Sequence, residues 1–92
     1  NMITSNEPGV YLEGEYGIRL ENEILCVDAA NGKLGFENLT FCPFDREAIL
    51  PELLTEEELA WLNNYHREVY EKIAPRVSAE TSAWLKEQTE KI

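Results

Sequence analysis

The carboxylates near the start of the chain are the side chains most able to support chemistry. Six acidic residues occur within the first 28 positions, where Arg19 is the only basic residue. Carboxylates that lie close together repel one another unless a cation or full solvation relieves the repulsion. The cluster therefore indicates either a cation site or the solvated face of a strand, and composition does not decide between the two.

Nucleophilic catalysis and a helical zinc site are both disfavoured. The serines at positions 5, 78 and 82 lie outside the strand-to-helix turn that activates a hydrolase serine. The single histidine, His66, falls within an expected helix, where Leu62 and Tyr70 occupy the positions one turn away. Neither side chain is a zinc ligand, so we interpret His66 as an ordinary packed histidine.

Length and charge restrict the class of protein. The chain has 92 residues, 43% of them apolar, which allows one small domain. A net charge of −10 argues against nucleic acid or an anionic membrane as a partner, because both are bound through clustered Lys and Arg. No apolar stretch approaches the roughly 20 residues of a membrane-spanning helix, and no segment is typical of a signal peptide. Two cysteines are too few for a disulfide scaffold, which favours a reducing, cytoplasmic setting.

The first half of the chain has the pattern of strands and turns. Glu7-Pro8-Gly9 is typical of a turn, and a second break follows over residues 14–17. Alternation of side chains predicts a strand over residues 17–28. Asn31-Gly32 predicts a two-residue hairpin turn, with the returning strand over residues 36–44.

This hairpin sets an expectation for the two cysteines. A two-residue turn at Asn31-Gly32 pairs Cys26 with Glu37 rather than with Cys42. We therefore expect two buried thiols and no disulfide.

The second half has the pattern of two helices. Thr55 and Glu58 form the motif of a capping box. Apolar residues then recur at helical spacing, at Leu59, Leu62, His66, Val69 and Ile73. The first helix should end near Ala74, before Pro75, and Ser78 can cap a second helix that continues to about Glu90. The sequence thus predicts an α+β fold: a short antiparallel sheet over residues 2–45, followed by two helices.

Two of the carboxylates, Glu7 and Glu21, belong to motifs that resemble a known family. The motifs are SNEPGVY at residues 5–11 and YGIRLEN at residues 16–22. They resemble the end of the catalytic domain of the Xaa-Pro aminopeptidases, which have the pita-bread fold. The resemblance continues through LTFCPFD at residues 39–45 and through WLNNYH at residues 61–66, which is similar to the helical extension of the long subgroup.

The resemblance implies roles for three residues. That family holds two divalent metal ions, usually manganese, with two Asp, one His and two Glu side chains. Glu7 matches the glutamate that binds one metal ion and is implicated in proton transfer, and Glu21 matches the glutamate that bridges both ions. Arg19 matches an arginine that pairs with a ligand aspartate. A strand suits the bridging role because it holds its side chains more tightly than a loop does.

The resemblance also implies that this chain carries two of five metal ligands. The other three lie upstream in the family, and Asp28, Asp45 and His66 do not stand in their sequence contexts. We therefore expect a carboxy-terminal fragment of a metal-dependent aminopeptidase that acts on peptides with proline in second position. Residues 1–45 would close the catalytic domain and residues 46–92 would form the helical extension. Alone, the fragment should bind metal weakly and hydrolyse nothing.

A non-catalytic assembly module is the alternative function. The expected helices carry four aromatic side chains, Trp61, Tyr65, Tyr70 and Trp84, which serve either core packing or a protein interface. In the subgroup that the chain resembles, the extension lies near a dimer interface. We expect the fragment to form a homodimer or to self-associate, because uncovered strand edges pair with other chains.

Overall fold

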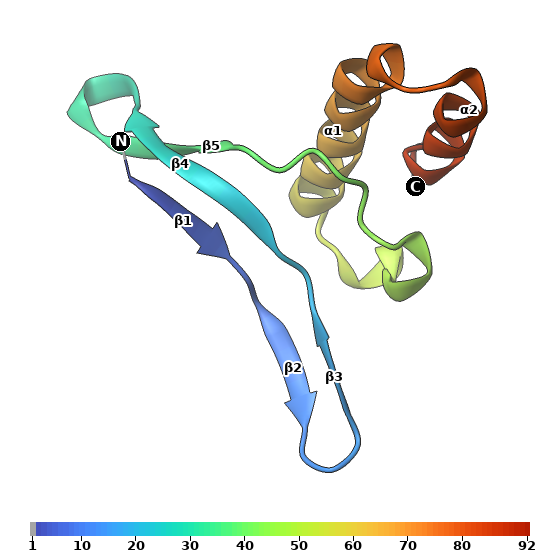
Figure 1. The fold of residues 1–92 in the computed structure, drawn as a ribbon. Coiled ribbons are helices and arrows are strands. Elements are labelled where there is room, and N and C mark those ends of the chain that lie inside the picture. Colours follow the sequence, from blue (N-terminus) through green and yellow to red (C-terminus); the bar gives the residue numbers. More distant parts are fainter. Residues whose placement is uncertain (1) are drawn as a thin grey trace. The chain divides into compact units, whose positions relative to one another are not determined.

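The computed structural model describes residues 2–92 and contains two compact units, one ending at Thr40 and one running from Phe41 to Ile92. The first unit is built from strands and the second from helices (Figure 1). The fold class is therefore α+β, as the sequence predicts. Within the described residues, no helix is long and apolar enough to cross a membrane.

The strand unit is one long β-hairpin with an additional strand beside it. β1 (Ile3–Asn6) and β2 (Gly9–Leu12) follow one another and pair with β4 (Asn22–Asp28) and β3 (Tyr16–Arg19), respectively (Figure 1). β5 (Leu34–Asn38) pairs with the other edge of β4. All pairs are antiparallel, and they form a sheet ordered β1-β4-β5 and a two-stranded sheet β2-β3.

The long hairpin reverses direction at Gly14 and not at Pro8. Gly14 has a φ of 73°, a left-handed conformation that costs glycine little because it has no Cβ. The Glu15 N–H closes the turn by donating to the Leu12 carbonyl at 2.9 Å. Pro8-Gly9 instead joins β1 to β2 in the same direction, so the predicted turn there is wrong. Proline has no N–H to donate, and it interrupts the ladder without reversing the chain.

The same interruption divides the strand predicted over residues 17–28. β3 ends at Arg19 and β4 begins at Asn22, which leaves Leu20 and Glu21 outside regular strand. The Leu20 N–H still donates to the Pro8 carbonyl at 3.2 Å, so the two sides of the hairpin stay in contact through the break.

The turn between β4 and β5 is longer than predicted. It spans residues 29–33 and includes a 3-10 turn, with Asn31 and Gly32 at φ values of 62° and 70°. The Ala29 N–H closes this loop by donating to the Lys33 carbonyl at 2.8 Å. Asn31-Gly32 therefore adopts the left-handed conformation expected of a hairpin turn, but within a five-residue loop.

The longer loop shifts the register by one residue. Cys26 faces Phe36, so the predicted pairing with Glu37 is wrong. The expectation that the cysteines form no disulfide is confirmed, since both thiols are free. The expectation that both are buried is wrong, because Cys26 is half-buried and Cys42 is exposed. β5 ends at Asn38, and the strand predicted to run on to residue 44 does not form.

The helical unit follows its sequence signals closely. α1 (Glu56–Ile73) begins at Thr55, whose side chain accepts from the Glu58 N–H at 3.1 Å while the Glu58 carboxylate accepts from the Thr55 N–H at 2.9 Å. This reciprocal pair is the predicted capping box. A 3-10 turn containing Pro75 follows α1, and α2 (Ala79–Gln88) begins after Ser78, which accepts from the Thr81 N–H.

The core of the helical unit lies under one face of α1. Tyr65, Val69 and Leu85 are buried together, and partly buried apolar side chains pack around them: Phe41, Phe44, Tyr70, Ile73 and Ala74. α2 ends two residues before the predicted limit, because the buried Thr89 hydroxyl donates to the Leu85 carbonyl at 2.8 Å and caps the helix there.

Two consecutive residues of α1 also hold the segment that precedes the helix. The Tyr65 hydroxyl donates to the Cys42 carbonyl at 2.7 Å and accepts from its N–H at 3.3 Å. His66 is fully buried, and its Nε2 accepts from the Phe44 N–H at 3.1 Å. Burial lowers the pKa of His66, which keeps the ring neutral and able to accept. The interpretation of His66 as a packed histidine is confirmed.

Candidate metal centre

Glu7 and Glu21 lie opposite each other at the break in the long hairpin. On one side of the break Asn6 faces Asn22, and on the other side Gly9 faces Arg19. The register is the same on both sides, so the carboxylate-bearing residues between them are direct cross-strand neighbours. Residues in such positions have Cβ atoms roughly 4.5–5.5 Å apart, and their side chains interact.

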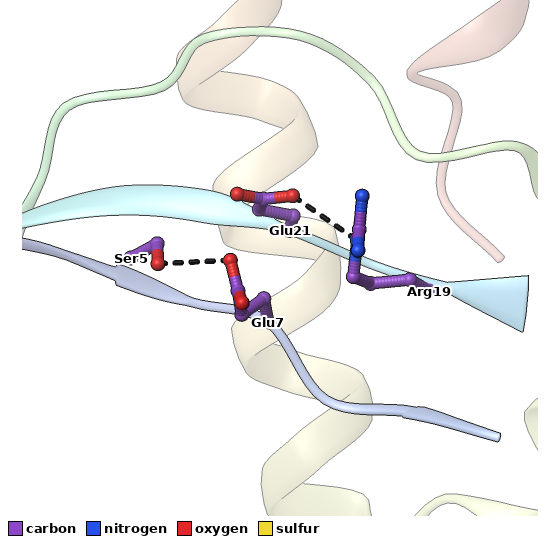
Figure 2. Close-up of polar contacts among 4 residues, drawn as sticks. All are labelled: Ser5, Glu7, Arg19 and Glu21. Atoms are coloured by element: carbon purple, nitrogen blue, oxygen red, sulfur yellow. Dashed lines mark hydrogen bonds and ion pairs between the residues drawn. The ribbon is translucent and has the colours of Figure 1, made fainter. Parts of the chain in front are cut away.

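The side chains of both glutamates are held by neighbours (Figure 2). The Ser5 hydroxyl donates to Oε2 of Glu7 at 2.9 Å. The Arg19 guanidinium forms an ion pair with Glu21, with 3.2 Å between Nε and Oε1. Figure 2 shows the two carboxylates near one another on adjacent segments of the hairpin. The structure thus brings together Glu7, Arg19 and Glu21, the three site residues considered from the sequence.

Glu7 and Glu21 shift each other's pKa in opposite directions. A hydrogen bond with Glu7 raises the pKa of Glu21, and the negative charge of Glu7 acts in the same direction. The pKa of Glu7 is lowered, first by the Ser5 hydroxyl and then by the hydrogen bond with Glu21. Two adjacent carboxylates repel one another, and the Arg19 guanidinium relieves part of this repulsion through its ion pair with Glu21. A divalent cation between the two side chains would relieve it further, because carboxylate oxygens are preferred ligands of hard divalent cations.

Arg19 also interacts with Tyr11, a residue that sequence reasoning did not consider for the site. The pKa of the Arg19 guanidinium is raised, chiefly by a hydrogen bond with Tyr11 and further by the negative charge of Glu21. The Tyr11 ring lies across two glycines. A Cβ on Gly17 would stand 2.6 Å from Tyr11 Cδ1, and one on Gly9 would stand 2.6 Å from the Tyr11 hydroxyl oxygen. Both positions therefore require glycine for the ring to reach Arg19.

Asn22 fixes the backbone immediately after Glu21. Its amide nitrogen donates to Asn38 Oδ1 at 2.9 Å, and the Asn38 amide donates in turn to the Thr40 carbonyl. Asn22 is buried, with 7% of its surface exposed, and its backbone pairs with β1. The first residue of β4, next to Glu21, is therefore hydrogen-bonded to β1 on one side and to β5 on the other.

Residues 2–92 do not contain a complete metal site. No group of three or more His, Cys, Asp or Glu side chains in that range could hold an ion. Sequence reasoning also missed the contact of Ser5 with Glu7. The signal was present, since Glu7 follows Ser5 by two positions in extended chain at the end of β1, and such residues project on the same side.

The family of the chain follows from comparison with known sequences. A family model described as the C-terminal region of peptidase_M24 matches residues 32–92. The chain therefore belongs to the peptidase M24 family, in which this C-terminal region lies.

Individual relatives share a more specific name. A probable Xaa-Pro aminopeptidase P from Coprinopsis cinerea is 42% identical over 97 residues, which cover 96% of this chain and 16% of the relative. A probable Xaa-Pro aminopeptidase P from Arthroderma benhamiae is 42% identical over 101 residues, which cover 100% of this chain and 14% of the relative. The chain thus spans about a sixth of the length of the curated relatives it matches.

A solved structure shares the fold. The X-prolyl aminopeptidase from Caenorhabditis elegans, described as a cytosolic enzyme with a di-nuclear active site, matches with a TM-score of 0.84 and 34% sequence identity. The match covers 98% of this chain and 16% of that enzyme.

Proposed function

We propose that this chain is the C-terminal part of a cytoplasmic aminopeptidase that uses two divalent metal ions, Mn²⁺ in particular, to remove the N-terminal residue from peptides with proline in second position. The observation that carries the proposal is the pair Glu7 and Glu21, which lie opposite each other at one break in the hairpin and alter each other's pKa. The names of the relatives and the di-nuclear site of the C. elegans enzyme support the same reaction.

Each of the three site residues has a distinct task in this proposal. Glu21 would help to hold the two ions, and Arg19 keeps its carboxylate oriented through the ion pair at Oε1. Glu7 would help to hold one ion, and its carboxylate would accept a proton from the attacking water and return it to the departing amine. When bound, a pair of divalent ions lowers the pKa of a shared water and so supplies a nucleophile at neutral pH.

The chain by itself should be inactive. Two carboxylates offer too few oxygens to offset the dehydration of a divalent ion, so metal binding to this chain alone should be weak. We place the end of the catalytic domain at residue 45 and assign residues 46–92 to the helical extension, which contains both α-helices of the described residues.

Reconstitution tests the proposal directly. The chain is mixed with the amino-terminal portion of the enzyme and with Mn²⁺, and release of the first residue from an Xaa-Pro peptide is measured. Glu21→Ala should abolish the reconstituted activity, whereas Glu13→Ala, which removes a glutamate from the hairpin turn, should leave it unchanged. Full activity of Glu21→Ala, or equal loss in both variants, would show that the metal-ligand assignment is wrong.

Self-association of the isolated chain is a second, compatible expectation. All eight residues of β2 and β3 are exposed, so this two-stranded sheet has no core of its own. In the helical unit, Trp61 and Trp84 are 55% and 54% exposed. Exposed apolar faces and open strand edges favour association between copies of a chain. Sedimentation should show dimers or larger species at high concentration, and a clean monomer would contradict this expectation.

A further inference from the structure

Glu7 lacks the restraints that fix its partner. Glu21 is followed by the buried, hydrogen-bonded Asn22 and is paired with Arg19. Glu7 lies just beyond the end of β1 and just before Pro8, and its side chain is exposed. A glutamate in such a place loses considerable rotamer freedom when it is held in one orientation.

Ser5 supplies a restraint of the kind that Glu7 needs. It belongs to β1, where its backbone faces Glu23 in the ladder, so its own position is fixed by the sheet. Two residues further on, Glu7 projects to the same side of the chain. The Ser5 hydroxyl donates to Oε2 of Glu7 at 2.9 Å, a hydrogen bond to a charged acceptor, which is stronger than one between neutral groups (Figure 2).

We propose that Ser5 is a positioning residue that holds Oε2 of Glu7 and thereby keeps this carboxylate turned toward Glu21, ready to receive a metal ion. The inference rests on the proposed function, because it takes Glu7 as a metal ligand. Ser5 itself touches neither substrate nor metal in this scheme. Groups that orient metal ligands through hydrogen bonds commonly change metal affinity or activity by 10–100-fold when they are removed.

The experiment uses the intact enzyme and measures two quantities for each variant. The first is the dissociation constant for Mn²⁺, obtained by competition with a chelating dye in the absence of peptide. The second is the pair kcat and KM for an Xaa-Pro peptide at saturating Mn²⁺. Ser5→Ala should weaken Mn²⁺ binding about tenfold and lower kcat with little change in KM.

Matched variants separate orientation from packing. Ser5→Thr keeps the hydroxyl and should behave as the native protein, whereas Ser5→Val has nearly the same shape as threonine without the hydroxyl and should resemble Ser5→Ala. Thr4→Ala removes a hydroxyl from the residue that precedes Ser5 in β1. The Thr4 side chain projects to the other side of the strand, so this variant should leave Mn²⁺ binding unchanged. If Ser5→Ala fails to fold, the comparison of Ser5→Thr with Ser5→Val still decides the question.

Failure of this inference is distinguishable from failure of the proposed function. Glu7→Ala should weaken Mn²⁺ binding more than any Ser5 variant. If Glu7→Ala has that effect but Ser5→Val binds Mn²⁺ as tightly as Ser5→Thr, the positioning role of Ser5 is refuted and the metal site stands. If Glu7→Ala binds Mn²⁺ normally, the assignment of the metal ligand itself is wrong, and the role of Ser5 is refuted with it.

Discussion

Replacing Gly17 by alanine should impair the metal centre without destabilising the fold. The added Cβ would stand 2.6 Å from Cδ1 and 3.3 Å from Cε1 of the Tyr11 ring. Carbon atoms pack at about 3.5–4.0 Å, so the ring has to move by about 1 Å. Tyr11 is 64% exposed and is free to turn into solvent, which takes its hydroxyl away from Arg19. Arg19 then loses the restraint that aims it at Glu21.

The magnitudes follow from these contacts. Alanine is favoured over glycine within a strand by about 0.5–1 kcal/mol, and this gain offsets the cost of moving an exposed ring. We therefore expect the free energy of unfolding to change by less than about 1 kcal/mol. Mn²⁺ affinity of the intact enzyme should fall about tenfold, as expected for loss of a group that orients a ligand. Tyr11→Phe, which keeps the ring and removes the hydroxyl, should show the same loss of affinity.

Gly14→Ala serves as the control, because it should lower the stability of the fold and leave Mn²⁺ binding unchanged. Gly14 has a φ of 73° and no atom within 4 Å of an added Cβ. Alanine there should cost about 1–2 kcal/mol of stability through backbone strain but leave Mn²⁺ binding intact. Thermal unfolding and Mn²⁺ titration of the two glycine variants are the measurements. Native Mn²⁺ affinity in Gly17→Ala, or an equal loss in Gly14→Ala, would refute the argument that the ring positions Arg19.

Three further predictions concern the packing of α1 and the charge of the carboxylate pair. Tyr65→Phe should lower the free energy of unfolding by about 1–3 kcal/mol, measured by urea titration, because it leaves both backbone polar groups of Cys42 without this partner. The pKa of His66 is lowered in the folded state, so protonation of its ring opposes folding. The free energy of unfolding should therefore keep the full contribution of His66 above pH 6.5, the ordinary pKa of histidine, and lose it as the pH falls below that value. A shallower loss of stability on acidification in His66→Gln would assign this pH dependence to the His66 ring. Because the pKa of Glu21 is raised, Mn²⁺ binding by the intact enzyme should weaken on acidification at a higher pH than an ordinary glutamate would produce. A calorimetric pH series measures this, and weakening only in the range of an ordinary glutamate would contradict it.

The helical unit was predictable because its signals are local. A capping box joins residues three positions apart, and an apolar stripe joins residues three and four positions apart, so both act within a segment that folds as one helix. Thr55 and Pro75 mark the limits of α1 correctly for this reason. The end of α2 was less well predicted, since it depends on the burial of Thr89 against the rest of the unit.

The sequence by itself determined which carboxylates to consider and what family they resemble, but tertiary structure decided that Glu7 and Glu21 face each other. Strand register depends on which of several turn signals closes the hairpin, and Pro8-Gly9 and Gly14 were both plausible from local chemistry. Once the chain reverses at Gly14, the two glutamates become cross-strand neighbours. The same pairing places the Tyr11 ring across Gly17, a contact between strands that no local pattern in the sequence records.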